Sequence, residues 1–288
     1  MKNAITHILL ILLFSQMTLA AEIKAPKPSR EMASAFDQSH AQWTQILQKL
    51  VVIRGHASTV KYGILKNDAA SLSSYLNALK SVSVAEFSKF TEDEKLAFLI
   101  NAYNAFTVKL IVDNYPLKSI RDLGSLISSP WKIKFFTFLG NERHLDNIEH
   151  GLIRQDAKAI QDIESNIRGI LPKFNEPRIH FALVCASIGC PALHNEAFIA
   201  ERLDTQLEDA ASNFIADTSR NRYLPENKKL EISSIFKWYG SDFIEKHGSF
   251  EAFLATRITS NLEEQRIIAN KKATVKFLEY DWSLNDEK

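Results

Sequence analysis

The chain has 288 residues, of which 45% are hydrophobic and 10% aromatic, and its formal net charge is +1 at pH 7. This apolar content is enough for a substantial core, and the length fits one large domain or two small ones. A nearly neutral chain gives no electrostatic reason to bind nucleic acid, so the sequence predicts no nucleic-acid partner.

The first residues have the pattern of a cleavable secretion signal. Lys2 precedes a short apolar run at residues 8–14, and small residues follow at Ala20 and Ala21. An apolar run of about 7 to 15 residues is too short to cross a bilayer, but it is typical of the centre of a signal peptide. We therefore expect residues 1–20 to be removed on export, with no membrane span afterwards and a periplasmic or secreted mature protein.

The N-terminal part of the mature chain is predicted to be helical after a short leader. Residues 21–30 contain two prolines and little apolar content, which predicts a mobile N-terminal segment. Residues 31–288 show neither a low-complexity linker nor an internal repeat, so we expect a single globular domain there. Apolar residues at helical spacing predict one helix over residues 32–52 and another over residues 68–79.

The clearest predicted element is a helix over residues 91–114. Its first turn has Thr91 and Glu94, whose side chains can satisfy each other's free backbone amides in a capping box. Both faces of this helix are apolar, which places it in the interior. Asn101 and Asn104 lie on one flank, where a buried amide must find hydrogen-bond partners, either as an internal tie or as part of a site.

A change of pattern follows at residues 132–145. Apolar and polar residues alternate there around Gly140 and Asn141. This pattern predicts a β-hairpin whose turn is formed by these two residues.

A second capping-box pattern begins directly after the predicted hairpin. It is formed by Asp146 and Glu149. The pattern predicts a helix that continues toward Ala159 and has His150 in its first turn.

The C-terminal part is predicted to be mixed. Strands are expected at residues 229–232 and 274–278, with mainly helical sequence between them. Phe236, Trp238 and Tyr239 lie in this stretch and resemble a binding platform, but aromatic residues beside apolar ones are more often core, so they are predicted to belong to the core. The fold class predicted for the whole chain is therefore α+β, a helix-dominated single domain with a small antiparallel β-sheet.

The densest group of reactive side chains lies at residues 178–191. His180, Cys185 and Cys190 fall within eleven positions of one another. Two cysteines in an exported chain of this size are too few for a disulfide scaffold that holds the fold together. Their role must therefore be local.

Several separated motifs resemble the domain-of-unknown-function family 547 of bacteria and plants. The resemblance spans roughly residues 85–285, and most of it lies in four motifs: Asn101-Ala102-Tyr103-Asn104-Ala105, Ile148-Glu149-His150, His180-Phe181-Ala182-Leu183 followed by Cys185 and Cys190-Pro191, and Trp282 in Tyr280-Asp281-Trp282-Ser283. The family often has a polar or small residue where Val184 stands, whereas Cys185 fits the pattern. Since the activity of the family is not established, the resemblance assigns no reaction.

One interpretation of the reactive group is nucleophilic catalysis. Cys185 would attack an acyl or amide carbonyl as a thiolate, and His150 would act as its base. Asn101 or Asn104, or the acid Glu149, would orient the imidazole. This trio predicts a cysteine-dependent hydrolase or acyltransferase.

Other candidate positions are expected to bind the substrate. These are His180, Tyr103 and Cys190. His180 is a poor base for Cys185, because five residues separate the two and place them on opposite faces of a strand or about 140° apart on a helix. The substrate is expected to be a small molecule or a peptide.

Two alternatives to catalysis stay open from the residues alone. The first is a zinc site made from Cys185, Cys190, His150 and His180. The second is an envelope binding or structural module in which Cys185 and Cys190 form a disulfide, which could also be reversible. The Cys-x4-Cys spacing is at the edge of the usual zinc-knuckle spacing and is not the common Cys-x-x-Cys redox motif, so neither a metal nor another cofactor is predicted.

Overall fold

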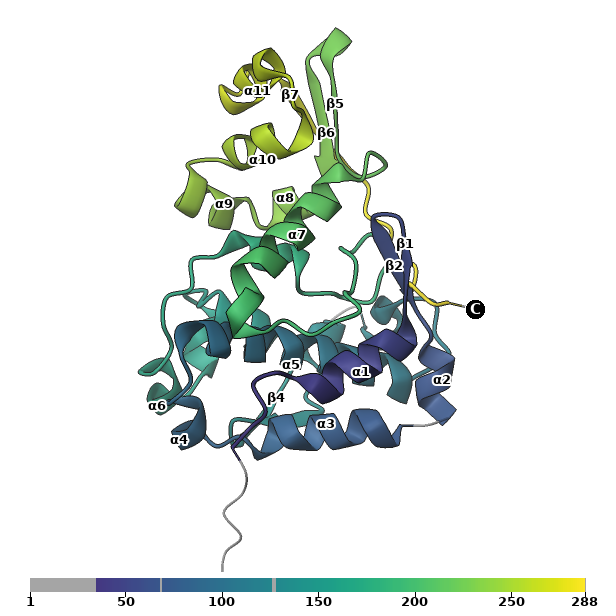
Figure 1. Ribbon diagram of the computed structural model, residues 1–288, viewed down its shortest axis with the longest axis vertical. Coiled ribbons are helices and arrows are strands. Elements are labelled where there is room, and N and C mark those ends of the chain that lie inside the picture. The colour runs from purple at the N-terminus through teal and green to yellow at the C-terminus, as the bar shows by residue number, and fades with distance from the viewer. Residues whose placement is uncertain (1–34, 68, 126–127, 288) are drawn as a thin grey trace, which may run out of the picture. The chain divides into compact units, whose positions relative to one another are not determined.

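Helices make up most of the structure, a computed structural model that describes residues 35–67, 69–125 and 128–287 (Figure 1). Its α-helices in this part of the chain are α1 (Ala41–Leu50), α2 (Tyr62–Asn67), α3 (Ala70–Ser81), α4 (Val84–Phe87), α5 (Glu92–Asp113), α6 (Ser165–Arg168), α7 (Leu203–Ala216), α8 (Ile235–Trp238), α9 (Gly240–His247), α10 (Phe250–Ile258) and α11 (Leu262–Ala269). The predicted secretion signal and the predicted mobile segment lie outside the described residues.

Small sheets complete the fold, so the predicted α+β class is confirmed. The strands are β1 (Val51–Arg54), β2 (Ala57–Val60), β3 (Phe136–Phe138), β4 (Asn141–Arg143), β5 (Arg222–Leu224), β6 (Lys229–Ser233) and β7 (Thr274–Leu278). Strands β1 and β2 form one hairpin, β3 and β4 form another, and β5, β6 and β7 form a sheet in that order. The sheet content is more varied than expected, because β6 and β7 run parallel while the other pairs are antiparallel.

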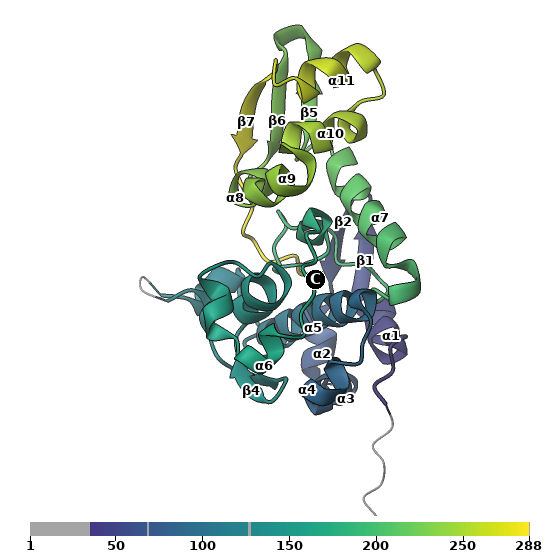
Figure 2. The same ribbon diagram turned by 90° about the vertical axis from the view of Figure 1, so that its left-hand side faces the viewer.

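Two clusters of buried apolar side chains form the interior of residues 35–287. The larger is built around α5 and includes side chains of α1, α2 and α3, and the smaller lies among β6 and α8 to α11. Helix α7 links them, since Leu203 and Leu207 belong to the larger cluster while Ala211 and Phe214 belong to the smaller. Figure 2 shows α7 running from the side of α1 and α5 toward α10.

Helix α5 confirms the strongest sequence prediction. The backbone N–H of Glu94 donates to Thr91 Oγ1 at 3.2 Å, and the N–H of Thr91 donates to Glu94 Oε2 at 2.7 Å, which completes the capping box. By length and composition α5 could cross a membrane, but 89% of its apolar window is buried inside the protein. It is the central helix around which the larger cluster packs.

Other predicted elements are also confirmed. Helix α3 buries Leu72, Tyr75, Leu76 and Leu79, the residues whose spacing predicted it. Strands β6 and β7 occupy the positions predicted for the two C-terminal strands, with one more residue at the end of β6. Local pattern was sufficient for these elements, because each buries one regular face.

The helix predicted over residues 32–52 is wrong at both ends. Helix α1 covers only Ala41–Leu50, and the chain then enters the β1–β2 hairpin; residues 32–34 lie outside the described residues. The β-branched run Val51, Val52, Ile53 favours extended backbone. Gly55, with a φ of 60°, supplies the left-handed conformation that the tight turn between the strands requires.

The hairpin predicted at residues 132–145 is present but shorter, and its turn is shifted by one residue. Phe138 pairs with Asn141, so the turn consists of Leu139 and Gly140. Their φ angles are 48° and 80°. Two successive left-handed residues are what a type I′ turn needs, and this places Asn141 in the strand.

The helix predicted from Asp146 toward Ala159 is also wrong. Asp146 makes no capping hydrogen bond, and the chain forms a short π-helix, η3 (Asn147–Ile153), instead. The Glu149 carboxylate turns away from the backbone and accepts a hydrogen bond from Tyr239 at 2.7 Å. Such π-helical turns are frequent at functional sites.

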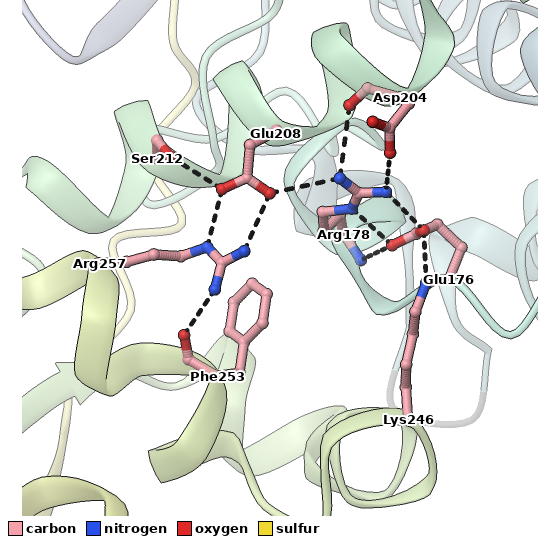
Figure 3. A network of polar contacts seen from close by, with 8 residues as sticks. All are labelled: Glu176, Arg178, Asp204, Glu208, Ser212, Lys246, Phe253 and Arg257. Carbon is pink, nitrogen blue, oxygen red and sulfur yellow. Dashed lines mark hydrogen bonds and ion pairs between the residues drawn. The ribbon is translucent and has the colours of Figure 1, made fainter. Parts of the chain in front are cut away.

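A network of ion pairs holds the 3-10 helix η5 (Pro177–Phe181) against α7, α9 and α10 (Figure 3). Its charged members are Glu176, Arg178, Asp204, Glu208, Lys246 and Arg257. Arg178 donates to Glu176 at 2.8 Å, to Asp204 at 2.7 Å and to Glu208 at 3.3 Å. Because η5 contains His180, this network fixes one side of the site described below.

Replacement of Arg178 by methionine should lower the free energy of unfolding by about 2–3 kcal/mol, because Glu176 then loses its main partner in a partly buried position. Burial alone would raise the pKa of Glu176, but hydrogen bonds from Arg178 and Lys246 outweigh it and lower the pKa to about 2. The difference in the free energy of unfolding between the wild type and Arg178→Met should therefore be complete above the ordinary Glu176 pKa of 4.5. It should disappear as the pH falls toward 2. Urea denaturation at several pH values measures it.

The matched control is Arg202→Met. Arg202 pairs with Glu196 at 2.6 Å, but the two side chains are 52% and 37% exposed. An exposed pair contributes about 0–1 kcal/mol. Equal losses in the two variants would contradict the role given to Arg178.

Candidate functional site

A cavity of about 410 Å³ lies between the two apolar clusters. Tyr103 on α5 lines it and belongs to the larger cluster, Ile235 on α8 lines it and belongs to the smaller, and Tyr280 packs against both. Ligand sites are typically enclosed spaces of about 300–1,000 Å³ with a few convergent polar groups. This cavity has that size, and polar groups lie on two of its three sides.

One side of the cavity is formed by a disulfide between Cys185 and Cys190. Cys185 is half-buried and Cys190 is 4% exposed. The loop between them is held by the C-terminal segment, since the N–H of Gly189 donates to the carbonyl of Asp281 at 2.8 Å. A Cβ at Gly189 would lie 3.0 Å from the backbone of Asp281, so any larger residue there would have to shift this backbone by a few tenths of an ångström.

Three donors surround the sulfur of Cys190. The backbone N–H of Cys185 and the hydroxyl of Tyr280 each lie 3.0 Å from it, and the hydroxyl of Ser187 lies 3.4 Å from it. Burial raises the pKa of the Tyr280 phenol, which therefore stays protonated at neutral pH and can donate. Donors directed at a sulfur stabilise its thiolate form.

A chain of hydrogen-bonded titratable groups forms the second side. His180 Nε2 lies 2.8 Å from Asp242 Oδ2, and the Asp242 carboxylate accepts two bonds from Arg154 at 2.7 and 2.8 Å. Arg154 Nη1 lies 2.7 Å from His150 Nδ1. Because a guanidinium only donates, His150 Nδ1 accepts, and the hydrogen of the ring is on Nε2, 3.9 Å from Asp146 Oδ1.

His180 is held by one ring nitrogen only. Burial would raise the pKa of Asp242, but its hydrogen bonds with Arg154 and His180 hold that pKa well below the ordinary value, so Asp242 is a carboxylate that accepts from His180 Nε2. Burial lowers the pKa of His180, which keeps the ring neutral at neutral pH. The other nitrogen, Nδ1, is buried and has no hydrogen-bond partner among the described residues.

Glu149 lies between the chain of titratable groups and α5. Its side chain accepts from the phenols of Tyr239 and Tyr103, and the residue is 6% exposed. Burial raises the pKa of both phenols, so they stay donors. The Tyr239 ring stacks on His180 with a centroid separation of 3.8 Å, and the Arg154 guanidinium lies 5.1 Å from the centre of the same ring.

The third side, which we call the aromatic wall, consists of Trp131, Trp238, Tyr280 and Trp282. Trp282 is its centre, with ring centroids 5.7 Å from Trp131, 5.7 Å from Trp238 and 4.5 Å from Tyr280. Trp238 is 44% exposed, which is unusual for a large aromatic side chain. Part of the Trp238 side chain in the aromatic wall therefore stays exposed.

The structure brings six of the sequence-predicted residues to this one cavity: Tyr103, Glu149, His150, His180, Cys185 and Cys190. Among the described residues, neither histidine makes a hydrogen bond to a cysteine sulfur; the partners of His150 are Arg154 and Asp146. Arg154 therefore binds His150 Nδ1, the atom that Asn101, Asn104 or Glu149 was predicted to bind as the orienting side chain.

The two asparagines predicted as candidates for that role lie elsewhere. Asn101 exchanges two hydrogen bonds with the backbone of Phe198, at 2.7 and 3.0 Å. Asn104 donates to the carbonyl of Ala182 at 2.9 Å and accepts from the N–H of Val184 at 2.9 Å. Both side chains tie α5 to backbone that flanks the disulfide loop, which is the internal-tie alternative of the sequence analysis.

Several residues of the site were not found by sequence reasoning. Arg154 and Asp242 carry no motif, and only the fold places them beside the histidines. Trp238 and Tyr239 were expected in the core, but both line the cavity, while Phe236 is buried as predicted. The available signal was the density of aromatic residues at 235–239, which is typical both of cores and of binding sites.

A metal centre finds no ligand set in the structure. No three His, Cys, Asp or Glu side chains within residues 35–287 that the structure describes are gathered so as to hold a metal ion. Both cysteines are joined in the disulfide. The zinc set considered from the sequence, Cys185, Cys190, His150 and His180, therefore does not form a metal site in the described part of the chain.

Comparison with known proteins agrees with the resemblance noted in the sequence. Residues 87–215 match the family described as "Protein of unknown function, DUF547". No curated protein and no solved structure matches the chain. The six predicted residues that line the cavity all fall inside the matched range, whereas Tyr239, Asp242, Tyr280 and Trp282 follow it. The chain therefore contains a domain of the DUF547 family, which covers residues 87–215.

Proposed function

We propose that this protein is an exported thiol–disulfide oxidoreductase in which the Cys185–Cys190 pair exchanges electrons with a thiol substrate bound in the cavity. The observation that supports it is the placement of the disulfide: it lines a cavity of about 410 Å³, and three donors surround the sulfur of Cys190. A bridge that only held a loop together would need neither a cavity beside it nor donors that stabilise a thiolate.

The reaction begins with attack on the more accessible sulfur. A substrate thiolate attacks Cys185 Sγ, the S–S bond breaks, and Cys190 leaves as a thiolate that Tyr280, Ser187 and the N–H of Cys185 stabilise. A second substrate thiolate then attacks the substrate sulfur of the mixed disulfide and releases Cys185. The substrate loses two electrons and two protons, the cysteine pair gains them, and an external disulfide oxidant restores the bridge.

The predicted export fits this reaction. The signal pattern at residues 1–20, outside the described residues, would deliver the protein to an oxidising compartment, where disulfides form and persist. The chemistry needs no metal or organic cofactor, because both redox groups are side chains of the chain itself.

The decisive measurement is the reduction potential of the Cys185–Cys190 pair. Protein purified without reductant should contain no free thiol, and equilibration with glutathione buffers followed by alkylation should give a potential above about −250 mV. A potential below about −300 mV is typical of structural disulfides and would refute the proposal. Two free thiols in the purified protein would refute it as well.

A matched pair of variants tests which sulfur is attacked. Cys190→Ser should trap a mixed disulfide with glutathione on Cys185, because the resolving thiol is missing while the half-buried sulfur stays reachable. Cys185→Ser should form much less of it, because Cys190 is only 4% exposed. Equal trapping by the two variants would contradict the proposed order of steps.

The sequence-based hydrolase prediction is kept as a second candidate, with altered roles. Cys185 and His180 line one cavity, as a thiol nucleophile and a base would, and the carboxylate of Asp242 orients His180 from behind. His150 is less suited as the base, because Arg154 occupies its Nδ1. Turnover of acyl or amide substrates by reduced protein, lost in both Cys185→Ala and His180→Gln, would favour this candidate over the oxidoreductase.

A further inference from the structure

The charged groups that line the cavity do not cancel. Arg154 is matched by Asp242, which accepts two of its hydrogen bonds, and its third nitrogen is taken by His150. Two other carboxylates, Asp146 and Glu149, line the cavity, and among the described residues no lysine and no arginine besides Arg154 does. The cavity therefore carries an excess of negative charge.

The aromatic wall suits a positive charge as well. The faces of tryptophan and tyrosine rings carry a negative potential and attract cations within about 6 Å. The chain already uses one ring of the aromatic wall and one other cavity ring in this way, since Arg121 lies 5.3 Å from the ring centre of Trp282 and Arg154 lies 5.1 Å from that of Tyr239. Trp238, which is 44% exposed, has no such cation among the described residues.

The carboxylate of Glu149 is fixed in place. Its hydrogen bonds with Tyr239 and Tyr103 hold it at the cavity while leaving the negative charge without a cationic side chain bonded to it in the described part of the chain. A carboxylate that is only 6% exposed interacts with a cation more strongly than one in water, because the effective dielectric constant around it is lower. A neutral or negative ligand group beside Glu149 would therefore add little to the binding free energy, whereas a cation would add more.

We infer that the cavity binds a small organic cation, an ammonium or quaternary ammonium group attached to an apolar body, with Glu149 as its counter-charge and Trp238 as its aromatic contact. This inference does not depend on the proposed redox reaction, since none of the groups it uses is a cysteine. It states the chemical class of the ligand, whatever reaction follows.

The test measures binding of four small probes to the disulfide-intact full-length protein by isothermal titration calorimetry. Benzyltrimethylammonium and benzylammonium carry the positive charge, phenylacetate carries a negative charge on a similar body, and benzyl alcohol is neutral. Both cations should bind saturably at one site, at least about tenfold more tightly than phenylacetate or benzyl alcohol. Because Trp131, Trp238 and Trp282 are three of the four tryptophans and line the cavity, intrinsic fluorescence should change with the same binding constant.

Variants identify the groups responsible. Glu149→Gln keeps an oxygen that can accept from Tyr239 but removes the charge, and it should weaken cation binding about tenfold, equal to about 1.4 kcal/mol. Trp238→Ala should weaken it to a similar degree. The control Glu142→Gln removes an exposed carboxylate at the β3–β4 hairpin and should bind as the wild type does.

Three outcomes would overturn the inference. These are tighter or equal binding of phenylacetate, unchanged cation binding by Glu149→Gln, and the absence of saturable binding of either cation at millimolar concentration. Each is independent of the reduction potential, so a failure here is distinguishable from a failure of the proposed oxidoreductase. Equal thermal stability of the variants and the wild type verifies that the site is still folded.

Discussion

Replacement of Tyr280 by phenylalanine should lower the reduction potential of the Cys185–Cys190 pair by about 30–60 mV. The Tyr280 hydroxyl lies 3.0 Å from Cys190 Sγ and 3.2 Å from Cys185 Sγ. A hydrogen bond to a charged group contributes about 1.5–3 kcal/mol, and 30 mV corresponds to about 1.4 kcal/mol for a two-electron couple. Because the hydroxyl stabilises the thiolate of the reduced form, its loss should make the disulfide harder to reduce.

Glutathione redox titration of the wild type and the variant measures this shift. Tyr223→Phe is the matched control, since Tyr223 is half-buried on β5 and its hydroxyl has no hydrogen-bond partner among the described residues. Its potential should equal that of the wild type. A Tyr280→Phe potential that is unchanged or higher would show that the hydroxyl does not stabilise the thiolate.

Replacement of Asn104 by leucine should lower the free energy of unfolding by about 3–5 kcal/mol. Asn104 is 3% exposed and is bonded to the carbonyl of Ala182 and the N–H of Val184. Leucine can bond to neither, so two buried backbone groups lose their partners at a cost of about 1–3 kcal/mol each. Urea denaturation followed by circular dichroism measures the loss.

The control for this variant is Asn195→Leu, at an exposed position near the same segment of the chain. A surface substitution of this kind should change the stability by no more than about 0.5 kcal/mol. A similar loss of stability in both variants would mean that it comes from the introduced leucine and not from the lost hydrogen bonds of Asn104 to Ala182 and Val184.

The elements that could be predicted are those set by residues close in sequence. The capping box of Thr91 and Glu94 starts α5, and the spacing of Leu72, Tyr75, Leu76 and Leu79 gives α3; both patterns need only one turn or one face of a helix. The π-helix at 147–153 was missed because Glu149, which could have capped a helix, bonds instead to Tyr239, 90 residues away. A local pattern cannot reveal a competing partner in another part of the fold.

The same reason limits the prediction of the site. Cys185, His150 and His180 were identified as reactive residue types, and the fold brings them to one cavity. Which group orients which histidine depends on Arg154 and Asp242. These two residues lie 88 positions apart in the sequence, so only the fold brings them together. For Asn101 and Asn104 the sequence allowed both an internal tie and a role in the site, since a buried amide gives the same pattern in either case.

Some residues that line the cavity lie within the matched range 87–215, and others follow it. This matters for the design of protein fragments. A fragment cut at the boundary after residue 215 would keep both cysteines but lose Tyr239, Tyr280 and Trp282, and with them the phenol that contacts both sulfurs. Such a fragment would lack the aromatic side chains that line the cavity beside the disulfide. Assays on fragments trimmed to the family boundaries would therefore test a site without the residues that complete the cavity in the 288-residue chain.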